Sequence, residues 1–335
     1  MTWLRSCLSN MNYDIIATLG PGSNEPAQWE AMLTAGATAF RLNTSHLTLR
    51  QTLKWLEKLE AMFHTTGTSV PVVLDLQGSK WRLGKLPAAN LKSGQQIELR
   101  HAASSDQSGI FPVPHQDFFR AAAASSGEII LNDAKLRLQI ESVYEENITA
   151  RVTQAGPIAA NKGITLAASN YRREGLNQKD ETIVKQALSF GFVRYAVSYI
   201  KDAAEMIAYR EHLGSEPYLI AKLERQQAMQ EAVEIAAFAN ELWICRGDLG
   251  AEVGLKALAE TVLDFATMLP RINVPVIMAG QVLEHMTRQP TPTRSEVCYL
   301  YETLQRGYQG FVLSDEAAIG LHPIESCAAA ALFRD

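Results

Sequence analysis

Two short stretches of this sequence place charged residues directly after apolar runs. Lys222 and Glu224 stand at the end of YLIAKLE, and Arg246 and Asp248 stand at the end of LWICRGD. Strands buried in a parallel sheet are continuous apolar runs, so charge repeated at one end of them indicates a functional site. The Glu224 and Asp248 carboxylates are the ligand type that a hard divalent cation accepts while it keeps several waters.

The cations near these carboxylates indicate an anionic ligand. Arg41, Arg82 and Lys222 would surround the metal with positive charge, which a phosphorylated or carboxylated small anion requires. The same charges would stabilise a phosphoryl group during its transfer. Gly247 would let a carboxylate approach the backbone N–H groups at the start of the following turn.

Eight strand-like runs alternate with amphipathic helical stretches, an order that predicts a (β/α)8 barrel of the α/β class. The strand-like runs cover residues 14–20, 37–43, 70–76, 194–200, 218–224, 242–248, 274–280 and 310–314. The helical stretches cover residues 25–36, 48–63, 179–191, 202–214, 226–240 and 258–269. Because the carboxyl ends of barrel strands meet at one mouth, the polar residues there should converge. They include Arg41, Asn43, Ser45, Asp75, Ser198, Lys222, Glu224, Asp248, Ser314 and Glu316.

The alternation of strand-like runs and helical stretches is interrupted between residues 79 and 169. There Gly, Ser, Asn and Pro separate short alternating segments such as QQIELR and NITARVTQ. We expect a small all-β domain inserted after the third barrel strand. The barrel would then comprise residues 1–78 and 170–335, and the insert residues 79–169. The loops after barrel strands lie on the face that carries the active site, so the insert could act as a lid.

Composition limits the classes of partner. The chain has 335 residues, 47% of them hydrophobic, with a net charge of −5 and no run of like charges, so we expect neither nucleic acid nor a membrane as a partner. No apolar stretch approaches the roughly 20 residues that span a bilayer, and the N-terminus lacks a signal-peptide core, so we expect a cytoplasmic protein. The four cysteines lack C-x-x-C spacing and are expected to be free thiols.

Nine motifs in this chain, in order and with similar spacing, resemble those of the pyruvate kinase family. They are ATLGPGS (17–23), FRLNTSH (40–46), VVLDLQGSKWRLG (72–84), NKGITL (161–166), AKLER (221–225), CRGDLGAEV (245–253), QVLEHM (281–286), PTRSE (292–296) and LSDEAAIG (313–320). The resemblance covers nearly the whole chain. It implies phosphoryl transfer from phosphoenolpyruvate to ADP, giving pyruvate and ATP, with Mg²⁺ or Mn²⁺.

The resemblance also implies a role for each matching residue. Glu224 and Asp248 would hold the divalent metal, and Lys222 would stabilise the phosphoryl group and the enolate. Arg41 and Arg82 would clamp the phosphate. The remaining implied sites are the substrate (Ser198, Gly247, Asp248 and Gly280), the nucleotide phosphates (Arg82 and Lys162) and the monovalent cation (Asn43, Ser45, Asp75 and the carbonyl of Leu76).

Among the substitutions that depart from the family pattern, two bear directly on the chemistry. Lys80 stands where potassium-dependent members have a glutamate, so we expect its ammonium to replace K⁺ and make K⁺ unnecessary. Gly280 stands where members have a threonine whose hydroxyl lies near the carbon that gains a proton. We therefore expect proton delivery through water, ordered by Ser314, and Gly280 to leave space where the hydroxyl would be.

The chain stops at Asp335, whereas typical members continue into a C-terminal regulatory domain, so we expect a short form without sugar-phosphate allostery. The stretch 284–296 resembles the family's contact between barrels and predicts a homodimer. Two alternatives to a kinase stay open. The barrel could bind phosphoenolpyruvate or another oxo-acid as a regulator without turnover, or act as a metal-dependent lyase on an oxo-acid.

Overall fold

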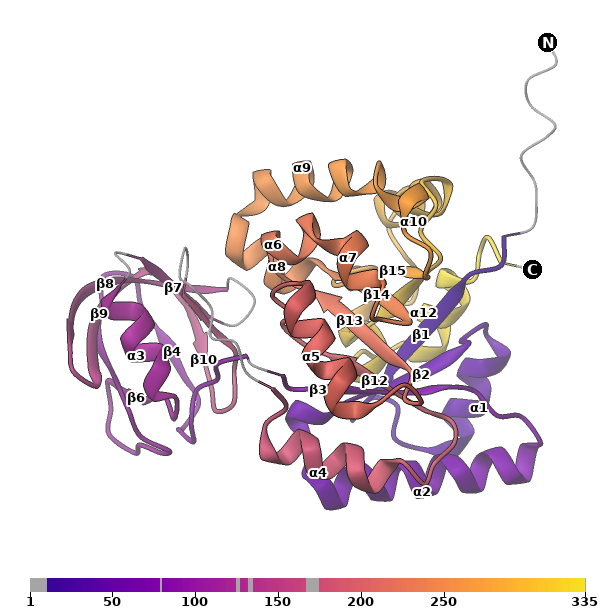
Figure 1. Cartoon of the computed structure of the whole chain (residues 1–335), viewed down its shortest axis with the longest axis horizontal. Coiled ribbons are helices and arrows are strands. Elements are labelled where there is room, and N and C mark those ends of the chain that lie inside the picture. The colour runs from indigo at the N-terminus through magenta and orange to yellow at the C-terminus, as the bar shows by residue number, and fades with distance from the viewer. Residues whose placement is uncertain (1–10, 79, 125–126, 132–134, 167–174, 335) are drawn as a thin grey trace, which may run out of the picture.

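A closed barrel of eight parallel strands forms the larger part of the computed structural model (Figure 1). The structure describes residues 11–78, 80–124, 127–131, 135–166 and 175–334. The barrel strands are β1 Asp14–Leu19, β2 Ala39–Asn43, β3 Val72–Leu76, β12 Val193–Val197, β13 Leu219–Leu223, β14 Glu241–Cys245, β15 Val276–Ala279 and β16 Gly310–Leu313. Each lies within or overlaps a run that the sequence predicts, so the predicted barrel is confirmed.

Alternating side chains of the strands build two apolar layers. Ile15 and Leu74 point outward into the large cluster shared with the helices. Ile16, Val73 and Trp243 belong to a separate inner cluster that fills the barrel. Because both faces are buried, the strands are apolar over most of their length and turn polar where they end.

Helices follow the barrel strands and pack against the outer layer (Figure 1). They are α1 Pro26–Thr34, α2 Leu49–Thr66, α4 Gln178–Ala187, α5 Ala203–Leu213, α6 Gln226–Gln230, α7 Ala232–Ala236, α8 Arg246–Val253, α9 Leu255–Ala266, α10 Arg294–Gln305, α11 Asp315–Ala318 and α12 Pro323–Ala330, with the 3₁₀ turns η1 Thr44–His46, η2 Leu269–Arg271 and η3 Glu284–Thr287. Thr48 and Thr293 begin α2 and α10 with capping boxes. The predicted helix over 226–240 is two short helices, α6 and α7. Among the described residues, no helix is long and apolar enough to cross a membrane.

The segment between β3 and β12 forms a second lobe beside the barrel (Figure 1). Its strands are β4 Ala89–Leu91, β5 Gln96–Arg100, β6 Ile110–Pro112, β7 Glu128–Leu131, β8 Leu136–Tyr144, β9 Asn147–Gln154, β10 Gly156–Ile158 and β11 Ile164–Leu166. Six of them form one sheet in the order β11-β7-β8-β9-β5-β6, and the lobe has its own apolar cluster. The predicted domain boundaries, at residues 79 and 169, lie outside the described residues and stay a prediction.

One helix, α3 (Gln116–Ala123), lies in this lobe. The expectation of an all-β lobe is therefore wrong. Phe118, Phe119 and Ala122 point into the apolar cluster of the lobe, which stabilises the helix through packing. The helix has only eight residues, and two of its apolar side chains are adjacent in the sequence, so no clear helical period marks it.

The point where the chain leaves β3 for the second lobe is fixed by Asp180. Its carboxylate accepts hydrogen bonds from the backbone N–H groups of Gln77 (3.2 Å) and Gly78 (2.9 Å). Asn177, the N-cap of α4, donates to the same carboxylate at 2.7 Å. Gly78 has φ +62°, and a Cβ there would lie 2.2 Å from the carbonyl oxygen of Ser198. Only glycine fits this exit, because both the backbone conformation and the space exclude a side chain.

Replacing Gly78 by alanine should therefore destabilise the barrel more than the same change at a roomy glycine. Gly67 at the end of α2 is the matched control, since its φ is +69° and no described atom lies within 4 Å of a Cβ there. We expect Gly67→Ala to cost about 1 kcal/mol and Gly78→Ala at least about 2 kcal/mol more, measured as the free energy of unfolding in urea. Equal losses would show that the exit is not constrained as described.

Candidate active site

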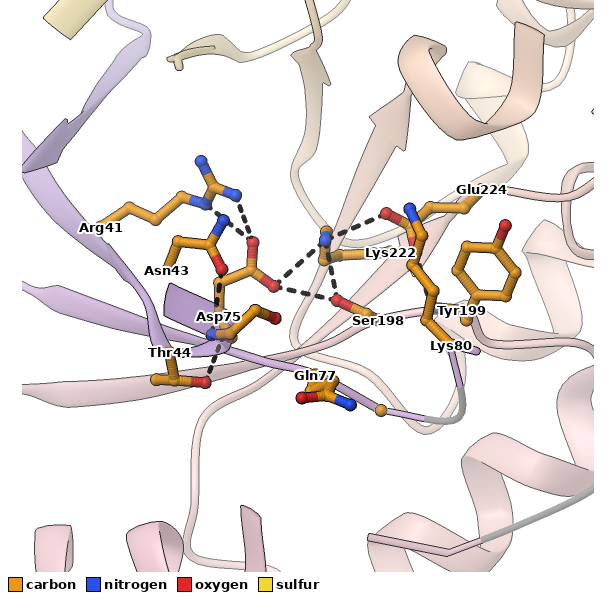
Figure 2. Close-up of polar contacts among 12 residues, drawn as sticks. Arg41, Asn43, Thr44, Asp75, Gln77, Lys80, Ser198, Tyr199, Lys222 and Glu224 are labelled. Atoms are coloured by element: carbon orange, nitrogen blue, oxygen red, sulfur yellow. Dashed lines mark hydrogen bonds and ion pairs between the residues drawn. The ribbon is translucent and has the colours of Figure 1, made fainter. Parts of the chain in front are cut away.

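Four polar side chains form the next inward-facing layer above the apolar interior of the barrel. They are Arg41, Asp75, Ser198 and Lys222, and each stands two residues after an apolar member of the inner cluster. Strand alternation therefore points all four toward the axis of the barrel at its carboxyl end. The sequence prediction that these residues converge on one mouth is confirmed by the contacts between them (Figure 2).

Asp75 is the centre of this layer (Figure 2). Its Oδ2 accepts hydrogen bonds from Arg41 Nε (2.8 Å) and Nη2 (2.5 Å). Its Oδ1 lies 3.0 Å from Ser198 Oγ and 3.1 Å from Lys222 Nζ. Lys222 also donates to Ser198 Oγ at 2.8 Å. Asp75 is thus held by two cations and a hydroxyl from the ends of three other strands.

Burial and neighbouring charges shift the pKa values of Asp75 and Lys222 in opposite directions. Burial alone would raise the pKa of Asp75, but Lys222 and Arg41 outweigh it and lower that pKa to about 2. Burial alone would lower the pKa of Lys222, but the Asp75 and Glu224 carboxylates outweigh it and raise that pKa above its usual value. Lys222 is therefore a permanent cation near neutral pH and cannot act as a general base.

Glu224 and Asp248 form the carboxylate pair that the sequence predicts as the metal site. Glu224 Oε1 lies 3.0 Å from Lys222 Nζ, and Glu224 Oε2 accepts the backbone N–H of Tyr199 at 2.6 Å. Burial raises the pKa of Glu224, and the charge of Asp248 adds to that rise. A divalent cation between the two would relieve their repulsion, so the residues present fit such an ion.

The two carboxylates suit a hard cation that takes its remaining ligands from water and substrate. Within the described part of the chain, no cluster of three or more His, Cys, Asp or Glu could hold a metal. Two carboxylates with water and substrate oxygens are a common donor set for Mg²⁺ and an unusual one for Zn²⁺.

Lys80 lies in a place other than the one expected. Its ammonium is ion-paired with Asp248 Oδ1 and lies 5.2 Å from the centroid of the Tyr199 ring. Figure 2 shows the side chain running past that ring toward Glu224. The ammonium was expected among the monovalent-cation ligands, but it pairs with one of the two carboxylates that the sequence predicts as metal ligands.

The oxygens predicted to bind a monovalent cation have protein donors. Asn43 Oδ1 accepts the backbone N–H of Ser45 at 3.2 Å, and Ser45 Oγ accepts Arg82 Nη2 at 2.9 Å. Asp75 is bound by Arg41 and Lys222 as described above. Leu76 is the last residue of β3 and pairs with Val197, which places its carbonyl at the barrel mouth. Because protein donors already bind these oxygens, the oxygens have less need of a monovalent cation.

Arg82 donates to two protein oxygens and leaves one nitrogen without a partner among the described residues. Besides its contact with Ser45, its Nη1 donates to the backbone carbonyl of Asn161 at 2.9 Å, whereas its buried Nε has no hydrogen-bond partner among the described residues. Burial lowers the pKa of His46, and the charges of Arg82 and Lys162 lower it further. His46, Arg82 and Lys162 therefore share one region of positive potential, as expected for a phosphate site.

No loop separates β14 from the helix that follows it. The helix α8 begins at Arg246, so the backbone N–H groups of Gly247 and Asp248 lie in its first turn, where a helix leaves them without intrahelical partners. No atom of the described residues lies within 4 Å of a Cβ at Gly247. Approach of a carboxylate to these groups stays a prediction.

Gly280 lies close to the start of α8. Its φ is +87°, and a Cβ there would lie 3.1 Å from the backbone nitrogen of Gly247 and 3.3 Å from that of Arg246. The start of α8 therefore packs closely on Gly280. A β-branched residue would be strained in this backbone, so a single substitution cannot restore the family threonine without a backbone shift.

Ser314, the predicted proton relay, follows β16, the strand beside the one that leads to Gly280. Its backbone N–H donates to Glu316 Oε2 at 3.0 Å, and that of Leu283 donates to Glu316 Oε1 at 3.2 Å. Burial raises the pKa of Glu316 to about 7. Glu316 thus joins the loops after β15 and β16 and titrates near neutral pH.

Sequence reasoning missed Tyr199, which links the site to the second lobe. Its backbone adopts φ +66° and its N–H donates to Glu224, while its hydroxyl lies 2.8 Å from Thr165 Oγ1 in β11. The guanidinium of Arg225 lies 4.2 Å from the centroid of its ring. Its position beside Ser198 was the only signal available in the sequence.

Known proteins are similar to this chain over most of its length. The family described as "Pyruvate kinase, barrel domain" matches residues 10–327. A pyruvate kinase of Agrobacterium vitis is 32% identical over 321 residues, covering 95% of this chain and 68% of the relative. Those of Methylorubrum extorquens (31%) and Thermococcus litoralis (30%) each cover 93% of this chain and 66% of the relative. The chain thus spans about two thirds of the length of these relatives.

The raised pKa of Glu316 predicts a pH-dependent stability. Folding favours its protonated form, so this contribution is complete below the usual pKa of 4.5 and is lost as pH rises through about 7. Glu316→Gln removes the titration. We expect the melting temperature of the variant to rise relative to the unmodified protein between pH 5 and pH 8.

The matched control is Glu325→Gln in α12, a less buried glutamate whose replacement should give no such pH-dependent difference. Parallel changes of melting temperature in the unmodified protein and Glu316→Gln across this range would contradict the assignment.

Proposed function

The chain belongs to the pyruvate kinase family, and we propose that it transfers the phosphoryl group of phosphoenolpyruvate to ADP, giving pyruvate and ATP. One observation carries the proposal. Lys222 is a buried, permanently charged ammonium held by Asp75 and Glu224 at the barrel mouth, with Arg41 beside it. A fixed cation in a site of low dielectric is what stabilises charge that develops during phosphoryl transfer.

The anion would enter a site whose donors are already oriented. The carboxylate of phosphoenolpyruvate would accept hydrogen bonds from the N–H groups of Gly247 and Asp248 at the start of α8. Its phosphoryl oxygens would meet Lys222 and Arg82, whose Nε lacks a partner among the described residues. Arg41, which is bound to Asp75, would act mainly by its charge.

In the transfer itself, an oxygen of the ADP β-phosphate attacks the phosphorus, and the bond from phosphorus to the enol oxygen breaks. Negative charge passes from the phosphoryl group to that oxygen, where Lys222 would stabilise it. A divalent cation on Glu224 and Asp248 supplies Lewis-acid stabilisation of the same charge. We propose Mg²⁺ or Mn²⁺ for this role, since both accept carboxylates and water.

The reaction ends when the methylene carbon of the enolate gains a proton. With Gly280 in place of the family threonine, we propose that the proton arrives through water ordered by Ser314. Losing one general-acid group typically costs about 10²- to 10⁴-fold in rate. We therefore expect a slow enzyme rather than an inactive one, because phosphoryl transfer does not need the missing hydroxyl.

The alternatives, a regulator without turnover and an oxo-acid lyase, drew support from the space expected at Gly280. A side chain there would be tight against the start of α8, so the space at Gly280 is a weak argument for them. The complete set of Arg41, Arg82 and Lys222 favours the kinase over both. The homodimer through residues 284–296, the role of the second lobe as a lid and a cytoplasmic location stay predictions.

The direct test is a coupled assay for pyruvate with phosphoenolpyruvate, ADP and Mg²⁺. We expect turnover that falls at least about 10²-fold in Lys222→Ala, because the charge on the enol oxygen loses its compensating ammonium. Lys256→Ala, which changes an exposed lysine of α9, is the matched control and should retain full activity. A protein that binds phosphoenolpyruvate but forms no pyruvate would refute kinase turnover.

Potassium should have little effect on this rate. The oxygens of Asn43, Ser45 and Asp75 already accept protein donors. We expect the rate in tetramethylammonium buffer to lie within about twofold of the rate after KCl is added at matched ionic strength. A strong stimulation by K⁺ would contradict the proposal that protein donors make a monovalent cation unnecessary.

A further inference from the structure

We propose that Lys80 is an internal counter-ion of the metal site, which holds Asp248 in the metal-free protein and is displaced when a divalent cation binds. The inference rests on the proposed function, since it assigns Glu224 and Asp248 to a divalent cation. It identifies Lys80 as a residue that lowers the affinity of the site for metal. The chain carries in its own sequence a cation that competes with the metal for one of its two carboxylates.

The residues around the stem of Lys80 leave room for its path to Asp248. The side chain crosses Gly163, where a Cβ would lie 2.3 Å from Lys80 Cε, so only a residue without a side chain permits this path. The ring of Tyr199 lies near its ammonium. Lys80 is 8% exposed, and its ion pair with Asp248 is thus largely shielded from water.

The charges of the mouth make competition the expected outcome. Among the described residues, three carboxylates face four cations: Asp75, Glu224 and Asp248 on one side, and Arg41, Lys80, Arg82 and Lys222 on the other. A divalent cation that entered beside Lys80 would add two positive charges within a few ångströms of its ammonium. Like charges at that distance repel strongly where water is scarce, so the ammonium must leave Asp248 when the metal binds.

Displacement of Lys80 would also loosen the link between the two lobes. Lys80 lies in the stretch that enters the second lobe, and Gly163 directly precedes β11, the last described strand of that lobe. The two stretches are joined by a bridge between Arg82 and Gly163, and Thr165 contacts Tyr199 on the barrel. Metal binding would therefore remove one of the contacts that hold the second lobe at the mouth.

Direct titration of Mn²⁺ tests the proposal without turnover. Free Mn²⁺ is followed by its electron paramagnetic resonance signal, with the whole chain at constant pH and ionic strength and no substrate. Lys80→Met nearly keeps the length of the stem and removes the charge, so we expect a Kd for Mn²⁺ at least about tenfold lower than that of the unmodified protein. Lys80→Arg keeps the charge and should bind Mn²⁺ within about twofold of the unmodified protein.

Two further variants make the result specific. Lys92→Met removes an exposed lysine of the second lobe, and an unchanged Kd there excludes an effect of net charge. In the background Asp248→Asn, the effect of Lys80→Met should disappear, because the carboxylate for which both cations compete is gone. Circular dichroism of each variant establishes that it is folded.

The outcomes separate the inference from the proposed function. Binding of Mn²⁺ that needs Asp248 but does not tighten in Lys80→Met would overturn the role of Lys80 and leave the metal site intact. Binding that does not depend on Asp248 would overturn both. Tighter binding in Lys80→Met that persists in the Asp248→Asn background would place the effect outside this ion pair, and it too would overturn the inference.

Discussion

The interaction on which this site depends is the burial of Asp75 between Arg41 and Lys222. A charge inside a barrel is costly unless partners compensate it, and removal of one partner leaves the others uncompensated. Each member comes from a different strand, β3, β2 or β13, so the closure of the barrel itself brings the charges together. The network therefore couples the fold to the chemistry, since the strand order that buries the apolar interior also holds Lys222 as a fixed cation.

Around this network the backbone is adapted to leave room for anions. Gly247 and Gly280 meet where α8 begins, and neither places a side chain against the first N–H groups of that helix. Tyr199 adopts a left-handed conformation, which its N–H bond to Glu224 helps to stabilise. Strain of this kind persists where the surrounding structure fixes it, and here it orients a carboxylate proposed to bind a metal.

Much of the fold could be predicted from the sequence because each barrel strand is a largely apolar run that ends in polar residues. Strand alternation places Arg41, Asp75 and Lys222 on the same inward face, so their convergence follows from periodicity. The partner of Lys80 could not be predicted, because a lysine stem reaches several places and only the path over Gly163 selects Asp248. The crowding at Gly280 depends on α8 starting without a loop, and the helix α3 was hidden among short alternating segments.

The central claim is that Asp75 holds the cations in place for phosphoryl transfer, and the kinetics of Asp75→Asn test it most directly. The amide keeps the size of the side chain but removes the charge that Arg41 and Lys222 share. We predict a loss of kcat/KM for phosphoenolpyruvate of at least about 10²-fold, in a protein whose circular dichroism spectrum is unchanged. A folded Asp75→Asn variant with the kcat/KM of the unmodified protein would contradict the account.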